Sequence, residues 1–502
     1  MKAKPIYPML FCSLVALIGC DDYLSETPNR GSNEPLNNST QIEALFNNSD
    51  LLDTYAFATA YASDDVFYSI EMYDMASYNF SSEMLPQYVW AIDDLANSGY
   101  DNLWEEQFNK VFQANLVLNE INEVTDLTDA TRTEYLAQAH FLRAVAYWQL
   151  VNIYCMPYAE ENLDLPGLPL KRTTSYEENL KRASLRDTYA FIEKDLIEAE
   201  KTQVADIKKR WLVSQPAVHA MLARFYLFTG AYDQAENHAA KALNSQRATL
   251  HDYNELGHVE SYVWNNDYSE EFLVNYSELY GYSPLQYTDY QESYYSEMYR
   301  NYCNPGLFPS ESLVELYDAE NDLRFAQFFT SHGTLEYGIE GFGDDLLYRK
   351  FYSSSFYNEL FPAGPSVPEM LLTQAEAMIR QGEWQEGLNV ANLLREKRMR
   401  SGSDYALTAA NQEDALRAVL DERHREMPFM MRWMDIRRFA YNETPSDDVT
   451  LSRTFYRVEN GVADWEQVEQ YTLPVKSKRY AQPLLTIELS RSHGQLEQNQ
   501  YD

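Results

Sequence analysis

Residues 216–245 read PAVHAMLARFYLFTGAYDQAENHAAKALNS, and this segment predicts the architecture of the chain. Alanines recur at helical spacing in its first half and again in its second half. Small residues on one face let two neighbouring helices approach closely. The segment therefore predicts a tetratricopeptide-like pair, in which Gly230-Ala231-Tyr232 forms the turn between an outgoing and a returning helix.

A second segment of the same kind spans residues 369–400. Leu372, Ala375 and Leu388 follow helical spacing, and Gly382-Glu383-Trp384 supplies the turn. The two segments lie far apart in the sequence, so the chain is not a tandem repeat array. A long insertion separates the two predicted helix pairs.

Five parts of the chain follow from this pattern. We expect a lipoprotein signal peptide at 1–19, a flexible tether at 20–40, a helical part at 41–245, an insertion at 246–368 and a C-terminal helical part at 369–502. The last three parts are expected to form one mainly helical domain.

The insertion at 246–368 is rich in Tyr, Asn, Ser, Gly and Pro, and its weak periodicity predicts loops with short strands, for example at 271–274. Long loop regions on a rigid scaffold usually carry function. The C-terminal part is expected to open with a charged helix from Glu413 to Phe439, disturbed at Pro428, and to end in a loop-rich tail.

The N-terminus indicates export. Lys2 and Lys4 precede an apolar run that is too short to span a bilayer, and Leu17-Ile18-Gly19-Cys20 leads directly into polar residues. A small residue before a cysteine at this point is typical of a bacterial lipobox, so we expect Cys20 to be lipidated. The alternative is an ordinary signal peptide that contains a chance cysteine.

Composition excludes several classes of protein. The chain carries 40 Lys+Arg against 77 Asp+Glu, a net charge of −37, which repels nucleic acid and anionic lipid. We therefore expect no nucleic-acid partner and membrane attachment by the lipid anchor alone. A hydrophobic content of 45% excludes general disorder. The 40 tyrosines suit contact with sugars, peptides or protein loops.

Motifs for catalysis, metal binding or cofactor binding are absent from the sequence, so we expect no enzyme, no metal and no cofactor. The run Asp421–Glu426 resembles a ligand cluster, but consecutive helical residues point in different directions, which favours a solvated or ion-paired helix. Abundant Asp and Asn leave structural calcium open, although no spaced ligand loop supports it. Cys155 and Cys303 are interpreted as two separate thiols, with a disulfide as the alternative.

Aromatic residues beside polar ones are the better functional signal, because sugars stack on flat rings while their hydroxyl groups need polar neighbours. One such group lies at 88–94 and another at 275–287. The alternatives are rings that fill small local cores and rings at the rim of a protein interface. The candidate ligand-binding residues are Tyr88, Trp90, Asp93, Asp94, Tyr280, Tyr282 and Tyr287.

The order of several motifs resembles the SusD/RagB family, the surface nutrient-binding lipoproteins of Bacteroidetes. No motif is specific alone, but together they cover nearly the whole mature chain. Departures occur at Tyr154-Cys155-Met156-Pro157, where the family usually has glycine, and at Met430-Met431. The motifs are Cys20-Asp21-Asp22-Tyr23-Leu24, Ser63-Asp64-Asp65, Trp104 with Asn115, Arg143-Ala144, Leu168-Pro169-Leu170, Asp195-Leu196, residues 217–235, Ala375-Glu376-Ala377 and Glu422-Arg423 with Arg432-Trp433.

This resemblance implies a mainly helical SusD-like fold, in which tetratricopeptide-like pairs support an irregular, ligand-binding half. It also implies a non-catalytic protein on the outer membrane, facing the cell exterior, that delivers oligosaccharide to a SusC-like TonB-dependent transporter. A peptide-binding lid of the same family is the alternative. A glycoside hydrolase and a pure interaction scaffold are the less favoured hypotheses.

Overall fold

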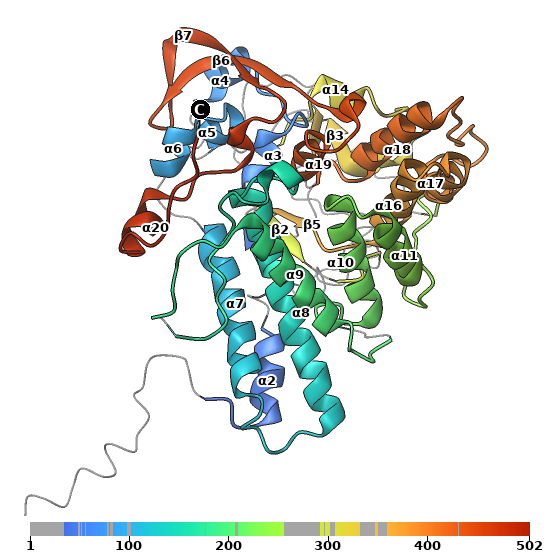
Figure 1. The fold of residues 1–502 in the computed structure, drawn as a ribbon. Helices are drawn as coiled ribbons and strands as arrows, with labels where there is room; N and C mark the ends of the chain where they lie inside the picture. The colour runs from blue at the N-terminus through green and yellow to red at the C-terminus, as the bar shows by residue number, and fades with distance from the viewer. Residues whose placement is uncertain are drawn as a thin grey trace, which may run out of the picture.

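A computed structural model of the chain is mainly helical (Figure 1). The structure describes residues 35–48, 51, 53–55, 57–77, 80, 84–97, 102–175, 177–205, 209–255, 292–295, 297–301, 307–331, 347–349, 359–429 and 431–501.

The N-terminal helices form the long lower part of Figure 1, where α7 lies beside α8 and α8 beside α9. The side chains of Thr128 and Ser184 accept backbone N–H groups at the starts of α8 and α9, as expected for N-caps. Helices are confirmed over most of the predicted helical part. The bounds are α2 Ser39–Phe46, α7 Asn102–Glu120, α8 Asp129–Tyr154 and α9 Leu185–Ala199.

The two predicted helix pairs are present. Gln215–Phe228 forms α10 and Tyr232–Leu243 forms α11, while Val367–Arg380 forms α16 and Trp384–Arg398 forms α17. Gly230 has a φ of 76° and Gly382 a φ of 100° in the intervening turns. Glycine adopts this left-handed conformation without the steric cost of a side chain. Six alanines of the first pair are fully buried: Ala217, Ala220, Ala223, Ala235, Ala239 and Ala242.

The two pairs meet in space although they are distant in sequence. Helices α10 and α11 both pack against α16. Arg224 of α10 donates two hydrogen bonds to the Glu369 carboxylate of α16, at 2.7 and 2.6 Å, and both side chains are buried. A paired, hydrogen-bonded charge of this kind tolerates burial. The two helix pairs therefore pack together as one scaffold, and described residues of the insertion, such as Tyr295 and Leu307, share their hydrophobic core.

The described part of the insertion contributes short strands, as predicted. Met298–Asn301 (β2) pairs with Asp53–Tyr55 (β1) in parallel and with Glu359–Pro362 (β5) in antiparallel register, and Phe329–Ser331 (β3) pairs with Leu347–Arg349 (β4). Two short helices, α14 Glu311–Val314 and α15 Leu323–Phe328, lie between these strands. The predicted strand at 271–274 lies outside the described residues.

The C-terminal part differs from the prediction in two ways. The charged helix is split into α18 Gln412–Glu426 and α19 Arg432–Phe439, because Pro428 cannot continue a helix and Phe429 adopts a φ of 67°. The expected loop-rich tail contains a long antiparallel hairpin, β6 Leu451–Glu459 and β7 Val462–Leu473, before α20 Thr486–Arg491.

The hairpin covers a group of short helices at one end of the molecule (Figure 1). These helices are α3 Phe57–Ala62, α4 Ile70–Ala76, α5 Met84–Tyr88 and α6 Ile92–Asn97. One continuous hydrophobic core joins them to the helix pairs. Within the described ranges, no helix combines the length and apolar character that crossing a membrane requires.

Candidate ligand-binding surface

The charged run at 421–426 is held in ion pairs. The Glu422 carboxylate lies 2.6 Å from guanidinium nitrogens of both Arg395 and Arg425. Burial alone raises the pKa of Glu422, but Arg324 and these two arginines outweigh that effect and lower it to about 2. The prediction of an ion-paired helix is confirmed.

The acidic pair Asp64 and Asp65 connects the N-terminal part of the fold to residues 424–432 of the C-terminal part. Asp64 accepts two hydrogen bonds from Arg432, each 2.7 Å long. Asp65 accepts the side chain of His424 and the backbone N–H of Phe429. Each of these four carboxylate oxygens already has a donor, so the pair acts as a structural link between the start of the fold and the C-terminal helices.

Tyr88 and Trp90 lie in the core, with 1% and 3% of their surfaces exposed. The Trp90 Nε1–H donates to the backbone carbonyl of Ala62 at 3.0 Å. The Arg453 guanidinium lies over both rings, 4.0 Å from the Tyr88 centroid and 4.6 Å from that of Trp90. Sugar stacking needs an accessible ring face, so this burial argues against direct stacking on either residue.

Asp93 and Asp94 lie on α6, close to the C-terminal hairpin. Asp93 is exposed and Asp94 is half-buried. The Asp94 carboxylate accepts the backbone N–H of Gly461 at 3.2 Å, which ties α6 to the hairpin turn. Asp93 is therefore the member of this pair that is open to solvent.

The other candidate residues fall outside the described ranges. They are Tyr280, Tyr282 and Tyr287 of the insertion, Cys20 at the proposed lipidation site, and Cys303. Their roles stay predictions. Cys155 is a free, buried thiol, and burial raises its pKa.

The hairpin carries a feature that sequence reasoning missed. Tyr456 pairs with Val468 and Arg457 with Asp464, so residues 465–467 form a bulge in β7. The Asp464 carboxylate accepts the backbone N–H two residues later at 3.0 Å, which holds the bulge in shape. Bulges re-aim side chains and are frequent beside functional sites.

The bulge presents Trp465, which is 51% exposed. Its ring centroid lies 5.4 Å from that of Tyr73 and 5.8 Å from that of Tyr456. The Tyr456 hydroxyl donates to Asp74 at 2.8 Å. We call these four residues the Trp465 surface: an open indole, supported by two buried tyrosines, with a carboxylate close by.

A column of rings connects this surface to the predicted site. Tyr73 lies 5.4 Å from Phe455, and Phe455 lies 5.5 Å from Tyr88, in edge-to-face contacts. The column stiffens the support beneath Trp465, because such ring pairs add about 0.5–1.5 kcal/mol each beyond burial. Tyr88 of the predicted group at 88–94 is therefore buried, and Phe455 and Tyr73 connect it to the exposed Trp465.

The Trp465 surface has the chemistry of a stacking site. Val462 and Val468 of the same strand are also exposed, at 61% and 54%. An indole face offers area to the C–H face of a sugar, and the neighbouring carboxylates can accept hydroxyl groups. Asn460-Gly461 between alternating residues was the sequence signal that could have revealed the hairpin.

Two family models match different parts of the chain. One family model, described as starch-binding and associating with the outer membrane, matches residues 22–227. A second, that of the SusD family, matches residues 368–501. The chain belongs to the SusD family.

Relatives are distant in sequence. A SusD-like protein of Formosa agariphila is 21% identical over 381 residues, covering 67% of this chain and 71% of its own. A SusD superfamily structure from Bacteroides thetaiotaomicron has a TM-score of 0.67 at 16% identity and covers 92% of this chain and all of its own. A putative sugar-binding protein from Bacteroides vulgatus has a TM-score of 0.65 at 16% identity, with coverages of 93% and 99%. These structures share the fold that the resemblance implied.

Proposed function

We propose that the protein binds oligosaccharide at the cell surface without cleaving it and delivers it to a SusC-like TonB-dependent outer-membrane transporter. Membership of the SusD family supports the binding role. The structural observation that carries the proposal is the exposed Trp465, held on a bulge above a column of rings. Tyr280, Tyr282, Tyr287 and Asp93 complete the proposed set of ligand contacts.

The choice of Trp465 rests on accessibility. Binding by stacking requires a ring that is fixed before the ligand arrives, since ordering a free side chain costs affinity. Trp465 meets both conditions, because its ring touches Tyr73 and Tyr456 while half of its surface remains open. Asp74, which accepts the hydroxyl of the supporting Tyr456, is a hydrogen-bond acceptor in the same group of residues.

A panel of oligosaccharides, read by thermal shift and then by calorimetry, tests the binding role. A bound ligand stabilises the folded state by mass action. We expect a glycan hit, and Trp465→Ala should weaken its binding at least tenfold, while Trp465→Phe should retain part of it. The matched control is Leu393→Ala, an exposed apolar residue (54%) on α17.

Other outcomes would redirect the proposal. Binding of mixed oligopeptides with no glycan hit would favour the peptide-binding lid. Release of product from the bound glycan would favour a glycoside hydrolase. Absence of any ligand in the panel, together with capture of the transporter, would favour a pure interaction scaffold. Equal glycan affinity in Trp465→Ala and in the unmodified chain would reject the Trp465 surface.

Attachment and delivery form the second half of the proposal. We propose that Cys20 carries the lipid and that the body faces the cell exterior. Cys20→Ala should release the protein from the outer membrane in fractionated cells. Co-purification of the TonB-dependent transporter with the lipidated protein would support delivery, and retention of Cys20→Ala in the membrane without that transporter would count against the lipid anchor.

A further inference from the structure

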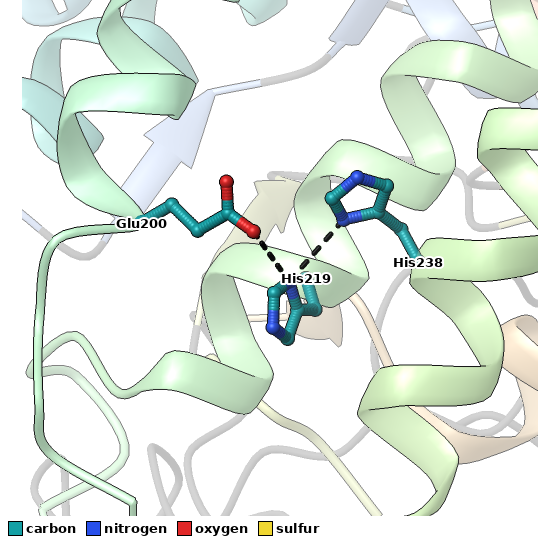
Figure 2. Close-up of side chains that lie close together, drawn as sticks. All are labelled: Glu200, His219 and His238. Atoms are coloured by element: carbon teal, nitrogen blue, oxygen red, sulfur yellow. Dashed lines mark hydrogen bonds and ion pairs between the residues drawn. The ribbon is translucent and has the colours of Figure 1, made fainter.

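Two histidines on neighbouring helices face each other on the helical scaffold. His219 of α10 and His238 of α11 have their Nδ1 atoms 3.2 Å apart. The Oε1 atom of Glu200, the residue that follows α9, lies 3.6 Å from His219 Nδ1. Figure 2 shows the Glu200 carboxylate and the His238 ring both directed toward His219.

Rigid elements hold this arrangement. The three side chains come from the C-cap of α9 and from helices α10 and α11, and the fully buried alanines Ala220 and Ala239 let α10 and α11 approach closely. His219 and His238 are 9% and 6% exposed, so their rings cannot turn freely into solvent. Glu200 is more open, with 34% of its side chain exposed, which leaves an entry path from solvent.

A hydrogen bond between the histidines explains only part of the geometry. One Nδ1–H can donate to the opposite Nδ1, but it leaves the Glu200 oxygen 3.6 Å from His219 Nδ1, beyond ordinary hydrogen-bond distance. Metal ligands are spaced differently. With bonds of about 2.0–2.1 Å to a tetrahedral zinc ion, ligand atoms lie roughly 3.3 Å from each other. The observed 3.2 and 3.6 Å bracket that spacing.

We propose that Glu200, His219 and His238 form a binding site for a divalent metal ion of the zinc class. The ligand atoms would be the two Nδ1 atoms and one carboxylate oxygen, all within 4.8 Å of one another, with water in the remaining position. The site is separate from the proposed glycan surface: α10 and α11 lie well apart from the hairpin in Figure 1.

Donor chemistry selects the class of metal. Imidazole nitrogen suits zinc, cobalt, nickel and copper, whereas magnesium and calcium prefer oxygen ligands throughout. Burial, assisted by Lys241, lowers the pKa of His238 to about 4, and burial lowers the pKa of His219 as well. A neutral imidazole keeps a lone pair for a metal.

The ammonium group of Lys241 would compete with the metal ion for the Glu200 carboxylate. Its Nζ lies 3.9 Å from the same Glu200 Oε1 that would bind the ion, and its side chain is 43% exposed. Because the ammonium group can swing into solvent, an incoming ion can take its place. Removing the charge without shortening the side chain greatly, as in Lys241→Gln, should therefore tighten metal binding.

Zinc titration of the full chain tests the proposal. The purified protein is stripped with EDTA and titrated with Zn²⁺ by calorimetry, and Co²⁺ absorption reports the coordination geometry. We expect one equivalent of Zn²⁺, a rise in Tm of several degrees that EDTA reverses, and a Co²⁺ spectrum of tetrahedral intensity. Glu200→Gln should weaken zinc binding at least tenfold, and Lys241→Gln should strengthen it severalfold.

Controls separate this site from surface binding. His238→Ala should abolish tight binding of the one equivalent of Zn²⁺, and circular dichroism checks that this variant folds. If His238→Ala does not fold, Glu200→Gln still tests the site, because Glu200 lies at a more open position. His493→Asn is the matched control, because His493 is exposed and Asn accepts its φ of 53°. Absence of zinc binding by the unmodified chain, or equal binding by Glu200→Gln and His493→Asn, would overturn the proposal.

Discussion

Arg453 fixes the two aromatic residues that the sequence singles out. Its guanidinium lies over Tyr88 and Trp90, and it donates to the backbone carbonyl of Tyr61 at 2.7 Å as well as to those of Tyr88 and Ser63. A guanidinium over a ring adds cation–π attraction that grows as water is excluded. The arginine thereby joins the hairpin to the short helices and fills the face of Trp90 that a sugar would need.

Trp90→Ala is expected to act on stability. The substitution opens a cavity beneath the hairpin and leaves the Ala62 carbonyl without its indole donor. Phe/Trp→Ala changes in a core cost about 3–5 kcal/mol. Denaturant unfolding should therefore show a loss of that order, whereas Trp465→Ala should lose less than about 1 kcal/mol because half of its ring is already in water.

The result also decides the role of Trp90 in binding. If Trp90→Ala keeps its unfolding free energy and loses glycan affinity, the ring contacts the ligand directly and the core assignment is wrong. Measuring both quantities on the same sample prevents a loss of folded protein from being read as a loss of affinity.

Residue-scale prediction from sequence had a clear limit. The ring-and-carboxylate pattern at 88–94 identified a region, but composition carries no information on which ring faces solvent. Trp465 has the same local pattern, between Asp464 and Glu466, but it lies in a stretch whose sequence predicts a loop-rich tail. Exposure depends on the bulge in β7, which is set by pairing with a strand rather than by the tryptophan itself.

Element-scale prediction succeeded where periodicity is long and failed where it is short. The spacing of alanines gave α10, α11 and the turn at Gly230. The hairpin has the strong turn signal Asn460-Gly461, both with positive φ (54° and 71°), but its apolar alternation is broken by the bulge. The sequence predicts a disturbance of the helix at Pro428. It does not predict the partner of the Phe429 N–H, because that partner is Asp65, which is far away in the chain.

Gly461→Ala should loosen the hairpin. A left-handed backbone costs an L-residue roughly 1–2 kcal/mol, and the strain falls where the Asp94 contact ties the turn to α6. We expect faster amide hydrogen exchange along β6 and β7 and a weaker glycan affinity, since the bulge that presents Trp465 belongs to this hairpin.

Gly402→Ala is the matched control for this change. Gly402 has a φ of 87° and open space around an added Cβ atom, so it carries the same backbone strain outside the hairpin. Its exchange along β6 and β7 should match the unmodified protein. Equal exchange rates in Gly461→Ala and Gly402→Ala would mean that the turn does not control the hairpin.

At the scale of the whole molecule, ion pairs join parts of the chain that local patterns cannot connect. The pair Asp64–Arg432 spans 368 residues, and Arg224–Glu369 spans 145. The order of motifs predicted the family and the mainly helical fold, because each motif is a local pattern that can be recognised in the sequence. Which acid meets which base was not predictable, because those contacts arise only when distant helices pack.

Acid should therefore unfold the protein through its buried carboxylates. The folded-state pKa of Glu422 is about 2, below its ordinary value of 4.5, and Glu376 and Asp435 are also lowered, since arginines outweigh the effect of burial on each. The unfolded chain then binds more protons than the folded one between about pH 4.5 and pH 2. The stability that Glu422 contributes is complete above pH 4.5 and is lost as the pH falls toward 2.

Glu422→Gln tests this window. Removing one partner of a buried pair costs about 3–5 kcal/mol at pH 7, and a side chain that cannot titrate should flatten the fall of unfolding free energy between pH 4.5 and pH 2.5. Guanidinium unfolding at pH 7, 4.5, 3.5 and 2.5 measures both effects. Glu413→Gln, an exposed position on the same helix, should change neither, because its 3.7 Å contact with Arg417 is open to water. If the unfolding free energy falls as steeply between pH 4.5 and pH 2.5 in Glu422→Gln as in Glu413→Gln, other carboxylates cause the acid unfolding.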